Sequence, residues 1–215
     1  MERLFPVLLR IAGRKCVVVG GGEVALRKIR SLLQHAASLV VVSPHAISGV
    51  LQLHNKGAIE YRQKRYDPAD LEGAFLVIAA TSQCEVNSAV ARDCERLGIP
   101  VNVVDDPDNC SFFVPAVLRR GSLSISVSTD GKSPMFSRCM REELEKRYPP
   151  EYGDFVDFLG EIRAWVMREI KDPQKKALTL RQLVDEQVMD LLHQGQFDQA
   201  KEYVRNVYIR CRSES

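Results

Sequence analysis

The chain has 215 residues, of which 45% are hydrophobic and 27% charged, with a net charge of +2 at pH 7. This composition is ordinary for a globular protein with one α/β domain and a smaller appendage, and the small charge argues against nucleic-acid or membrane partners. No apolar run approaches the roughly 20 residues of a membrane-spanning helix, and the charged N-terminus does not resemble a secretory signal. The six cysteines lack paired spacing, which favours a reducing cytoplasmic location over disulfides or zinc.

A glycine triplet between an expected strand and an expected helix is the most informative local motif. The run 16–19 is short, apolar and β-branched, as in a strand buried on both faces of a parallel sheet. In the spacing G-x-G-x-x-A, Gly20 allows a tight turn, Gly22 lets backbone approach a pyrophosphate, and Ala25 permits close helix–strand packing. The helix N-terminus adds N–H donors for phosphates, so the motif predicts a dinucleotide site; the alternative is a purely structural turn.

Strand and helix patterns alternate through the rest of the first half. Further strands are expected at 39–42, 59–61, 75–80 and 101–104, and helical segments at 47–54, 67–71 and 85–97. The apolar segment 4–11 contains Pro6, and we expect it to pack irregularly or as an edge strand against the first sheet strand. Alternation with short loops predicts a Rossmann-like, doubly wound parallel sheet.

Polar residues follow three of the expected strands, where ligands of open α/β sheets bind. Ser43 stands where an acidic residue usually contacts the ribose, and since no arginine adjoins it, NAD is weakly favoured over NADP. Thr81 ends the strand at 75–80 and faces the same crevice. Asp105 follows the strand at 101–104, near the expected nicotinamide position, where a carboxylate suits a general base or metal contact. Turn hydrogen bonding is an equally good explanation of Asp105.

The pattern changes in the second half of the chain. Two strands are expected at 111–118 and 123–128, and helices at 135–147, 155–171, 178–193 and 196–209. Ser133 is expected to cap the first of these helices, with Pro134 at its first position. The fold class is therefore a Rossmann-like sheet, then a small α+β segment, then a helical domain. The corresponding regions are 1–112, 113–148 and 149–215.

Hydroxyl and basic side chains cluster along the α+β segment. Ser128 and Lys132 lie in a loop before a helix, which suits an anion. Arginines flanking the same elements suit the carboxylates of an acidic ligand, although most surface arginines have no such role. They are Arg119, Arg120 and Arg138. The four histidines lack metal-ligand spacing, so no resident metal is predicted.

Together these motifs resemble the precorrin-2 dehydrogenase/sirohydrochlorin ferrochelatase family, which forms the N-terminal module of siroheme synthases and also occurs free-standing. The resemblance runs from Pro6 to Tyr148 through GGGEVALRK, NVVDDPDNCSFFVPA and STDGKSP in unbroken order. It implies oxidation of the tetrapyrrole precorrin-2 to sirohydrochlorin with NAD as hydride acceptor. It also implies a homodimer whose central segment crosses between subunits. It leaves open whether the protein has a second activity, the insertion of Fe²⁺ to give siroheme.

The resemblance also assigns roles to residues. Asp105 is implicated in dehydrogenation and chelation. NAD is expected against Gly20, Gly22, Glu23, Val24, Ser43, Pro44, Thr81 and Val104. The carboxylates of the ring are expected near Ser128, Lys132, Arg119, Arg120 and Arg138. Thr129 stands where multifunctional bacterial enzymes carry a serine that can be phosphorylated, which weakens any carry-over of such regulation and leaves phosphorylation of Thr129 open.

Two alternative functions remain open from the sequence. A dehydrogenase without chelatase activity would use the same carboxylate for one step only. A non-catalytic NAD-sensing domain, similar to those attached to potassium channels, would resemble the first half alone and leave the later motifs unexplained. Absence of NADH formation from a reduced tetrapyrrole would favour the sensor.

Overall fold

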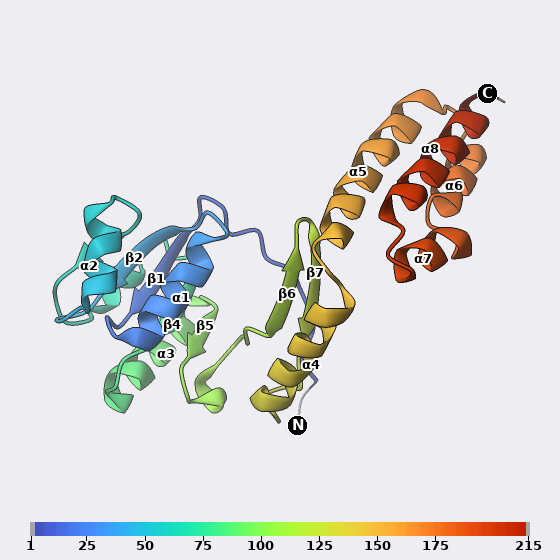
Figure 1. The fold of residues 1–215 in the computed structure, drawn as a ribbon. Helices are drawn as coiled ribbons and strands as arrows, with labels where there is room; N and C mark the ends of the chain where they lie inside the picture. The colour runs from blue at the N-terminus through green and yellow to red at the C-terminus, as the bar shows by residue number, and fades with distance from the viewer. Residues whose placement is uncertain (1–2, 214–215) are drawn as a thin grey trace. The chain divides into compact units, whose positions relative to one another are not determined.

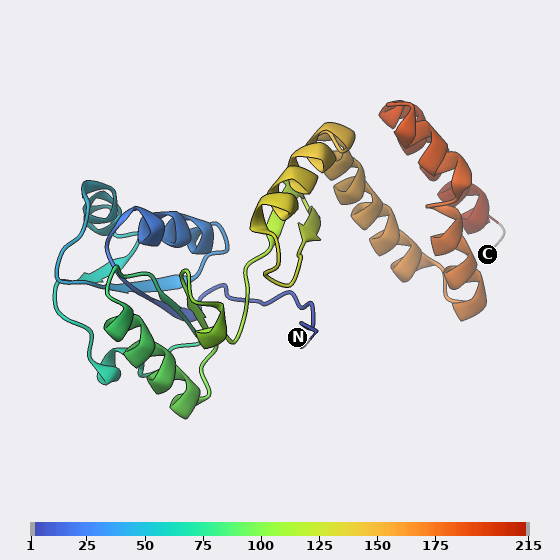
Figure 2. The same ribbon diagram turned by 90° about the horizontal axis from the view of Figure 1, so that it is seen from below.

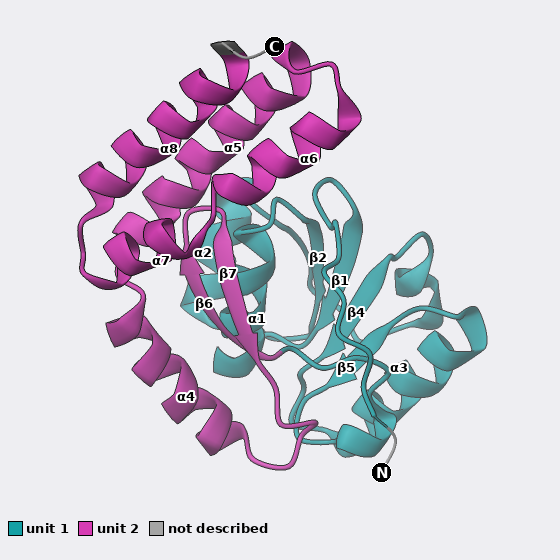
Figure 3. Cartoon of the chain, turned by 90° about the vertical axis from the view of Figure 1, so that its right-hand side faces the viewer, with its two compact units in different colours: residues 1–114 teal, residues 115–215 magenta. Residues whose placement is uncertain are grey.

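The computed structural model describes residues 3–213, and the chain divides into two compact units, residues 1–114 and 115–215 (Figure 3). The first unit has a core on each face of its sheet, and the second has a core of its own. Within the described range, none of the helices combines the length and apolar character needed to cross a bilayer. The regional boundaries at 112 and 148 stay predictions, because these units are defined by contacts and not by function.

A five-stranded parallel sheet forms the centre of residues 1–114, in the order β3-β2-β1-β4-β5. Its strands are β1 (Lys15–Val19), β2 (Ser38–Val42), β3 (Glu60–Arg62), β4 (Leu76–Ala79) and β5 (Val101–Val103). The chain moves outward from β1 to β3 and then returns to the other side of β1. The topological switch point therefore lies between β1 and β4, where ligands of such sheets bind.

Helices cover both faces of this sheet, which confirms the doubly wound prediction (Figure 2). Helices α1 (Glu23–Leu33) and α2 (Ser48–Asn55) lie on one face, and α3 (Cys84–Leu97) and the 3-10 helix η1 (Pro68–Leu71) lie on the other. Adjacent residues of β1 show the two-sided burial, since Val17 packs toward α3 and Val18 toward α1. Both valines are 0% exposed, as the non-alternating sequence predicted.

The N-terminal segment differs from expectation. Residues 4–11 have no regular structure, and Phe5 and Leu8 are 86% and 85% exposed. Only Ile11 joins the core. The segment is irregular, as one form of the prediction expected, although most of it is exposed. The edge-strand form is wrong, because β1 is central and pairs on both sides with β2 and β4. No edge of β1 is left for it.

The second unit begins with an antiparallel strand pair, β6 (Ala116–Arg120) and β7 (Leu123–Val127), in which Ala116 pairs with Val127. Helices follow: α4 (Pro134–Arg147), α5 (Glu151–Glu169), α6 (Pro173–Gln182), α7 (Glu186–His193) and α8 (Phe197–Ser213). Figure 1 shows α5 to α8 packed together, and their apolar residues form the core of this unit.

Two elements of the second half are not as expected. The strand predicted at 111–118 begins only at Ala116, because Ser111 is bonded to β5: its N–H donates to the Val101 carbonyl at 2.9 Å. The helix predicted at 178–193 is two helices. Asp185 ends the continuity by capping α7, its Oδ1 accepting from the Val188 N–H at 3.1 Å. The apolar residues keep helical spacing across 178–193, so the sequence pattern alone does not reveal the break at this cap.

Candidate functional site

The glycine triplet forms a turn in which each glycine meets different surroundings. A Cβ on Gly20, whose φ is 129°, would lie 2.3 Å from the Ala80 carbonyl oxygen. A Cβ on Gly21 would lie 2.3 Å from the carbonyl oxygen of His45. A Cβ on Gly22 would meet nothing within 4 Å. The first two glycines therefore allow close packing of the protein, and Gly22 leaves open space at the surface of the turn.

Gly21 is the residue of this loop that the sequence pattern missed. Its carbonyl oxygen accepts from the Ile47 N–H at 2.9 Å, which holds the segment before α2 against the turn. The G-x-G-x-x-A fingerprint treats this position as variable. The run of three glycines was the available signal, because adjacent glycines indicate backbone approach from more than one side.

The N-terminus of α1 presents free donors beside Gly22. Gly22 is its N-cap and supplies no side-chain cap, and the ladder begins with the Leu26 N–H donating to the Gly22 carbonyl at 2.9 Å. The first N–H groups of a helix have no intrahelical acceptor, and they carry the positive end of its dipole. Open space and uncapped donors together fit the pyrophosphate of a dinucleotide, with Glu23 and Val24 in the first turn.

Ser43 shapes the loop after β2. It is 9% exposed, and its hydroxyl donates to the His45 carbonyl at 2.7 Å. The Tyr61 hydroxyl donates to the Ser43 carbonyl at 2.9 Å, and burial raises the pKa of that phenol. These bonds hold Ser43 and the exposed Pro44 at the carboxyl end of β2. Contact of either residue with a ribose stays a prediction.

Thr81 is held at the end of β4 by a buried asparagine. The Thr81 hydroxyl lies 2.8 Å from Asn87 Oδ1, and Asn87 Nδ2 donates to the Thr81 carbonyl at 3.1 Å. Asn87, in the first turn of α3, is only 6% exposed. Sequence reasoning missed it; the signal was a polar residue on the apolar face of an amphipathic helix.

Asp105 lies on the exposed segment between β5 and the 3-10 helix η2 (Pro107–Asn109). Its φ is 60°, in the left-handed region, which costs an L-residue about 1–2 kcal/mol. Before it, the Val104 N–H donates to the Ala79 carbonyl at 2.9 Å, so pairing with β4 continues to the residue before Asp105. Non-glycine residues in such conformations cluster at functional sites.

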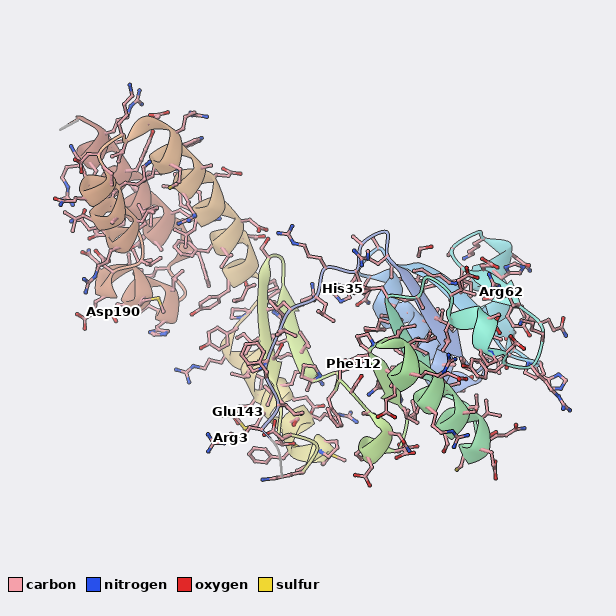
Figure 4. The ribbon with its side chains drawn as sticks, turned by 180° about the vertical axis from the view of Figure 1, so that it is seen from behind. Arg3, His35, Arg62, Phe112, Glu143 and Asp190 are labelled. Carbon is pink, nitrogen blue, oxygen red and sulfur yellow. The ribbon has the colours of Figure 1, made fainter. Side chains whose placement is uncertain are left out.

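Side chains behind Asp105 fix the segment. The Val103 N–H donates to Cys110 Sγ at 3.1 Å, and burial raises the pKa of this thiol. Asn102, 7% exposed, donates from Nδ2 to the carbonyl of Phe112 at 3.1 Å; Figure 4 labels Phe112. Cys110 therefore acts as a structural hydrogen-bonding group of this turn.

The structure brings the expected cofactor residues and Asp105 to one edge of the sheet. They follow the carboxyl ends of parallel strands, namely β1 (Gly20, Gly22, Glu23, Val24), β2 (Ser43, Pro44), β4 (Thr81) and β5 (Val104, Asp105). Parallel strands end at a common edge, and here that edge includes the switch point between β1 and β4. The roles of the individual residues stay predictions.

The expected substrate residues lie in the second unit, where their surroundings differ. Arg120 is hydrogen-bonded to the protein's own backbone: its Nε donates to the Tyr148 carbonyl at 2.9 Å, just beyond the last turn of α4. Arg138 is exposed and paired with Glu142 at 2.8 Å, and that hydrogen bond raises its pKa. Arg119, Ser128 and Lys132 are exposed on β6 and the loop after β7.

The loop before α4 is shaped by hydroxyl groups. Ser133 caps this helix as expected, its Oγ accepting from the Phe136 N–H at 3.3 Å, with Pro134 at the first position. Thr129 Oγ1 accepts from the Ser133 N–H at 3.0 Å and lies 3.2 Å from the hydroxyl of Ser137. Ser137 was not singled out from the sequence. In the part of the chain that the structure describes, no group of three or more His, Cys, Asp or Glu could hold a metal ion.

Family models match most of the chain. An NAD(P)-binding model covers residues 7–116, and the model "Sirohaem biosynthesis protein central" covers residues 120–147. The siroheme synthase of Methylobacillus flagellatus is 36% identical over 96% of this chain and 44% of its own length. That of Chromobacterium violaceum is 42% identical over 78% of this chain and 36% of its own length. The chain thus spans less than half the length of these curated relatives.

A solved structure matches nearly end to end. It is described as "SirC, precorrin-2 dehydrogenase", is 30% identical, and superposes with a TM-score of 0.73 over 93% of this chain and 99% of that one. The match includes the parallel sheet, the strand pair and the helices that follow. The chain therefore belongs to the precorrin-2 dehydrogenase family of siroheme-biosynthesis proteins, as its motifs predicted.

Proposed function

We propose that this protein oxidises precorrin-2 to sirohydrochlorin with NAD as the hydride acceptor. The observation that carries the proposal is the exposed Asp105 at the sheet edge where the glycine turn and the uncapped α1 N-terminus also lie. In a member of this family, that arrangement supports a carboxylate and a pyrophosphate site at the same edge of the sheet. NAD, when bound, supplies the two-electron acceptor.

The chain's own residues bind, orient and accept a proton. The first-turn N–H groups of α1 would hold the pyrophosphate, and Gly22 leaves room for it. Thr81 and Val104, each fixed by hydrogen bonds, would hold the remainder of the cofactor at the same edge of the sheet. Oxidation removes a hydride and a proton from the substrate, and Asp105 takes the proton as general base.

The second unit supplies groups for the substrate's carboxylates. Arg119, Lys132 and Ser128 are exposed on one strand pair and its following loop. Arg138 can exchange its exposed partner Glu142 for a ligand carboxylate, because surface ion pairs are weak. Arg120 instead supports the end of α4, so we expect it to act through structure.

Iron insertion and dimer formation belong to the same proposal. Insertion of Fe²⁺ releases pyrrole N–H protons, and Asp105 is the carboxylate available to accept them; a dehydrogenase without this step is the alternative. A homodimer is supported by the apolar surface of α4, where Met135 and Phe136 are 66% and 57% exposed. We expect a second copy of this chain to cover that surface, and we expect the protein to be cytoplasmic.

One assay sequence tests the proposal. Purified protein receives precorrin-2 and NAD while NADH absorbance is followed, and Fe²⁺ is then added with and without NAD. We expect Asp105→Ala to lower turnover by roughly 100- to 10,000-fold with little change in the Kd for NAD. The matched control is Asp108→Ala, an exposed carboxylate of the same segment, which should retain turnover.

The outcomes are separable. Wild-type turnover by Asp105→Ala would refute the general-base role. No NADH formation by the wild-type protein would favour the NAD-sensing alternative. Dehydrogenation without any metal insertion would support the alternative of a dehydrogenase that lacks chelatase activity.

A further inference from the structure

Asn87 is a buried asparagine of α3 whose side-chain amide is bonded to Thr81, at the end of β4. Asn87 Oδ1 accepts from the Thr81 N–H at 3.2 Å, and Asn87 Nδ2 donates to the Thr81 carbonyl at 3.1 Å. The side chain therefore holds both backbone polar groups of Thr81. Its removal would leave these two groups without a protein partner, which is costly in a part-buried position.

The hydroxyl of Thr81 is also used inside the protein. Its Oγ1 accepts from the Gln83 N–H at 3.1 Å. Its proton has two acceptors within reach, Asn87 Oδ1 at 2.8 Å and the Gln83 carbonyl at 3.0 Å. Because a threonine hydroxyl has one proton to donate, none is left for a ligand in this arrangement. Thr81 therefore contributes to the sheet edge through the position of its backbone and not as a hydrogen-bond donor.

The backbone that Asn87 holds packs against the first glycine of the dinucleotide turn. A Cβ on Gly20 would lie 2.3 Å from the Ala80 carbonyl oxygen and 3.2 Å from the Thr81 nitrogen. Both atoms belong to the peptide that joins Ala80 to Thr81, so this peptide lies directly against Gly20. The Ala80 N–H also donates to the Val19 carbonyl at 2.8 Å, which connects the same segment to the end of β1. The end of β4 and the turn after β1 thus meet at the switch point of the sheet.

These contacts connect the two faces of the sheet. Helix α3 covers one face, and α1, which begins at the glycine turn, covers the other (Figure 2). Asn87 reaches from α3 to Thr81, and the peptide before Thr81 supports Gly20, two residues before the N-cap of α1. Rotation of this peptide would move its carbonyl oxygen relative to Gly20 and would displace the first N–H groups of α1.

We infer that Asn87 is a positioning residue for cofactor binding. It fixes the peptide against which the glycine turn packs, and so keeps the turn in the form that accepts a pyrophosphate. The inference rests on the NAD binding in the proposed function and does not depend on proton transfer at Asp105. Asn87 is 6% exposed and acts through Thr81, without touching the cofactor. An amide suits this place, because it both donates and accepts and adds no negative charge beside a pyrophosphate site.

The first test is calorimetric titration of the full chain with NAD, under conditions in which urea denaturation shows each variant to be folded. We expect Asn87→Ala to raise the Kd for NAD about tenfold, the size expected for the net loss of one or two hydrogen bonds. Asn87→Asp keeps the shape and the acceptor but cannot donate to the Thr81 carbonyl, so its Kd should rise too. Thr81→Val removes the hydroxyl and keeps the backbone bonds to Asn87, so its Kd should rise less than that of Asn87→Ala.

The matched control lies on the same helix. The Tyr66 hydroxyl donates to Asp93 Oδ2 at 2.9 Å, further along α3. Tyr66→Phe removes this part-buried hydrogen bond, so we expect a lower urea midpoint while the Kd for NAD stays within about twofold of wild type. An equal rise of Kd in Tyr66→Phe and Asn87→Ala would mean that lost stability alone weakens binding, and it overturns the inference.

NMR gives a readout that general destabilisation does not change. The amide signals of Gly20 and Gly22 report the turn, and the amide of Thr81 reports its bond to Asn87. In Asn87→Ala we expect all three signals to shift, and the Thr81 amide to exchange with solvent about tenfold faster. Tyr66→Phe should leave the three signals at their wild-type positions.

The outcomes separate this inference from the proposed function. A wild-type Kd or wild-type glycine signals in Asn87→Ala overturn the inference, and if that variant does not fold, Asn87→Asp decides. A larger rise of Kd in Thr81→Val than in Asn87→Ala makes the hydroxyl a direct cofactor contact and also overturns it. If the wild-type protein binds NAD but makes no NADH from precorrin-2, the proposed function fails, and the NAD titration still decides the role of Asn87. Failure of the wild-type protein to bind NAD overturns both.

Discussion

The two units position their polar groups by different means. In residues 1–114, the candidate groups follow strands of a sheet that is covered on both faces, and buried asparagines fix the strand ends. In residues 115–215, the corresponding groups project from a two-stranded ribbon and an exposed helix, paired with surface neighbours. Substitutions of these fixed groups in the first unit should therefore have larger effects than substitutions of the exposed groups in the second.

The largest effect is expected at the glycine turn. Gly20→Ala places a Cβ 2.3 Å from the Ala80 carbonyl oxygen, at a φ of 129° that alanine rarely adopts. The backbone must shift, so we expect a loss of about 3 kcal/mol or more in the free energy of unfolding, together with loss of NAD binding. Urea denaturation and NAD titration measure these. Gly22→Ala, with open space around its Cβ, should lose only about 1 kcal/mol or less through the poorer N-cap, while weakening NAD binding. Wild-type stability and NAD binding in Gly20→Ala would contradict the proposed difference between the two units.

An intermediate effect is expected at Asp70, a carboxylate that is 2% exposed in the first unit. Burial acts to raise its pKa, but hydrogen bonds from Lys64, the Asp67 N–H and Arg62 lower it overall. A carboxyl with a lowered folded pKa stabilises the protein above its unfolded pKa of about 3.9, and this stability is lost as pH falls through the folded pKa. Asp70→Asn should lose about 2 kcal/mol or less at neutral pH, because both cationic partners are partly exposed.

The second unit offers a matched carboxyl for this experiment. Glu169 has a lowered pKa through the Tyr208 hydroxyl and Arg168, yet its surroundings are solvated. Denaturation between pH 7 and pH 3 should show a shallower acid dependence in Asp70→Asn than in wild type. Glu169→Gln should change that slope less. The reverse order would contradict the contrast between a packed sheet and a surface network.

The smallest effect is expected at Arg120. Its guanidinium donates to the carbonyls of Tyr148 and Glu145 at the end of α4, at 2.9 and 3.3 Å. Arg120→Met keeps the stem and removes these bonds, so we expect a loss of about 1 kcal/mol. Turnover should fall less than in Arg119→Met, whose side chain is exposed. A larger loss of turnover in Arg120→Met would make it a direct ligand contact.

Much of the fold was predictable because its signals are local. Four-residue apolar runs without alternation indicated buried parallel strands, and the Asp67-Pro68 and Ser133-Pro134 pairs marked helix starts that the structure confirms. The failures also have physical reasons. Residues 4–11 are apolar, but β1 has no open edge at which they could pair. Apolar residues keep helical spacing across 178–193, so this spacing did not reveal that Asp185 begins a new helix.

By itself, the sequence determined the parallel sheet, the dinucleotide turn and the place of Asp105 at a strand end, because periodicity and glycine spacing act over a few residues. Only the tertiary structure decided that Gly21 packs against His45 and that Asn87 holds Thr81. The physical reason is that packing and hydrogen bonding depend on distances that only the folded chain establishes, whether the partners are six residues apart or 24.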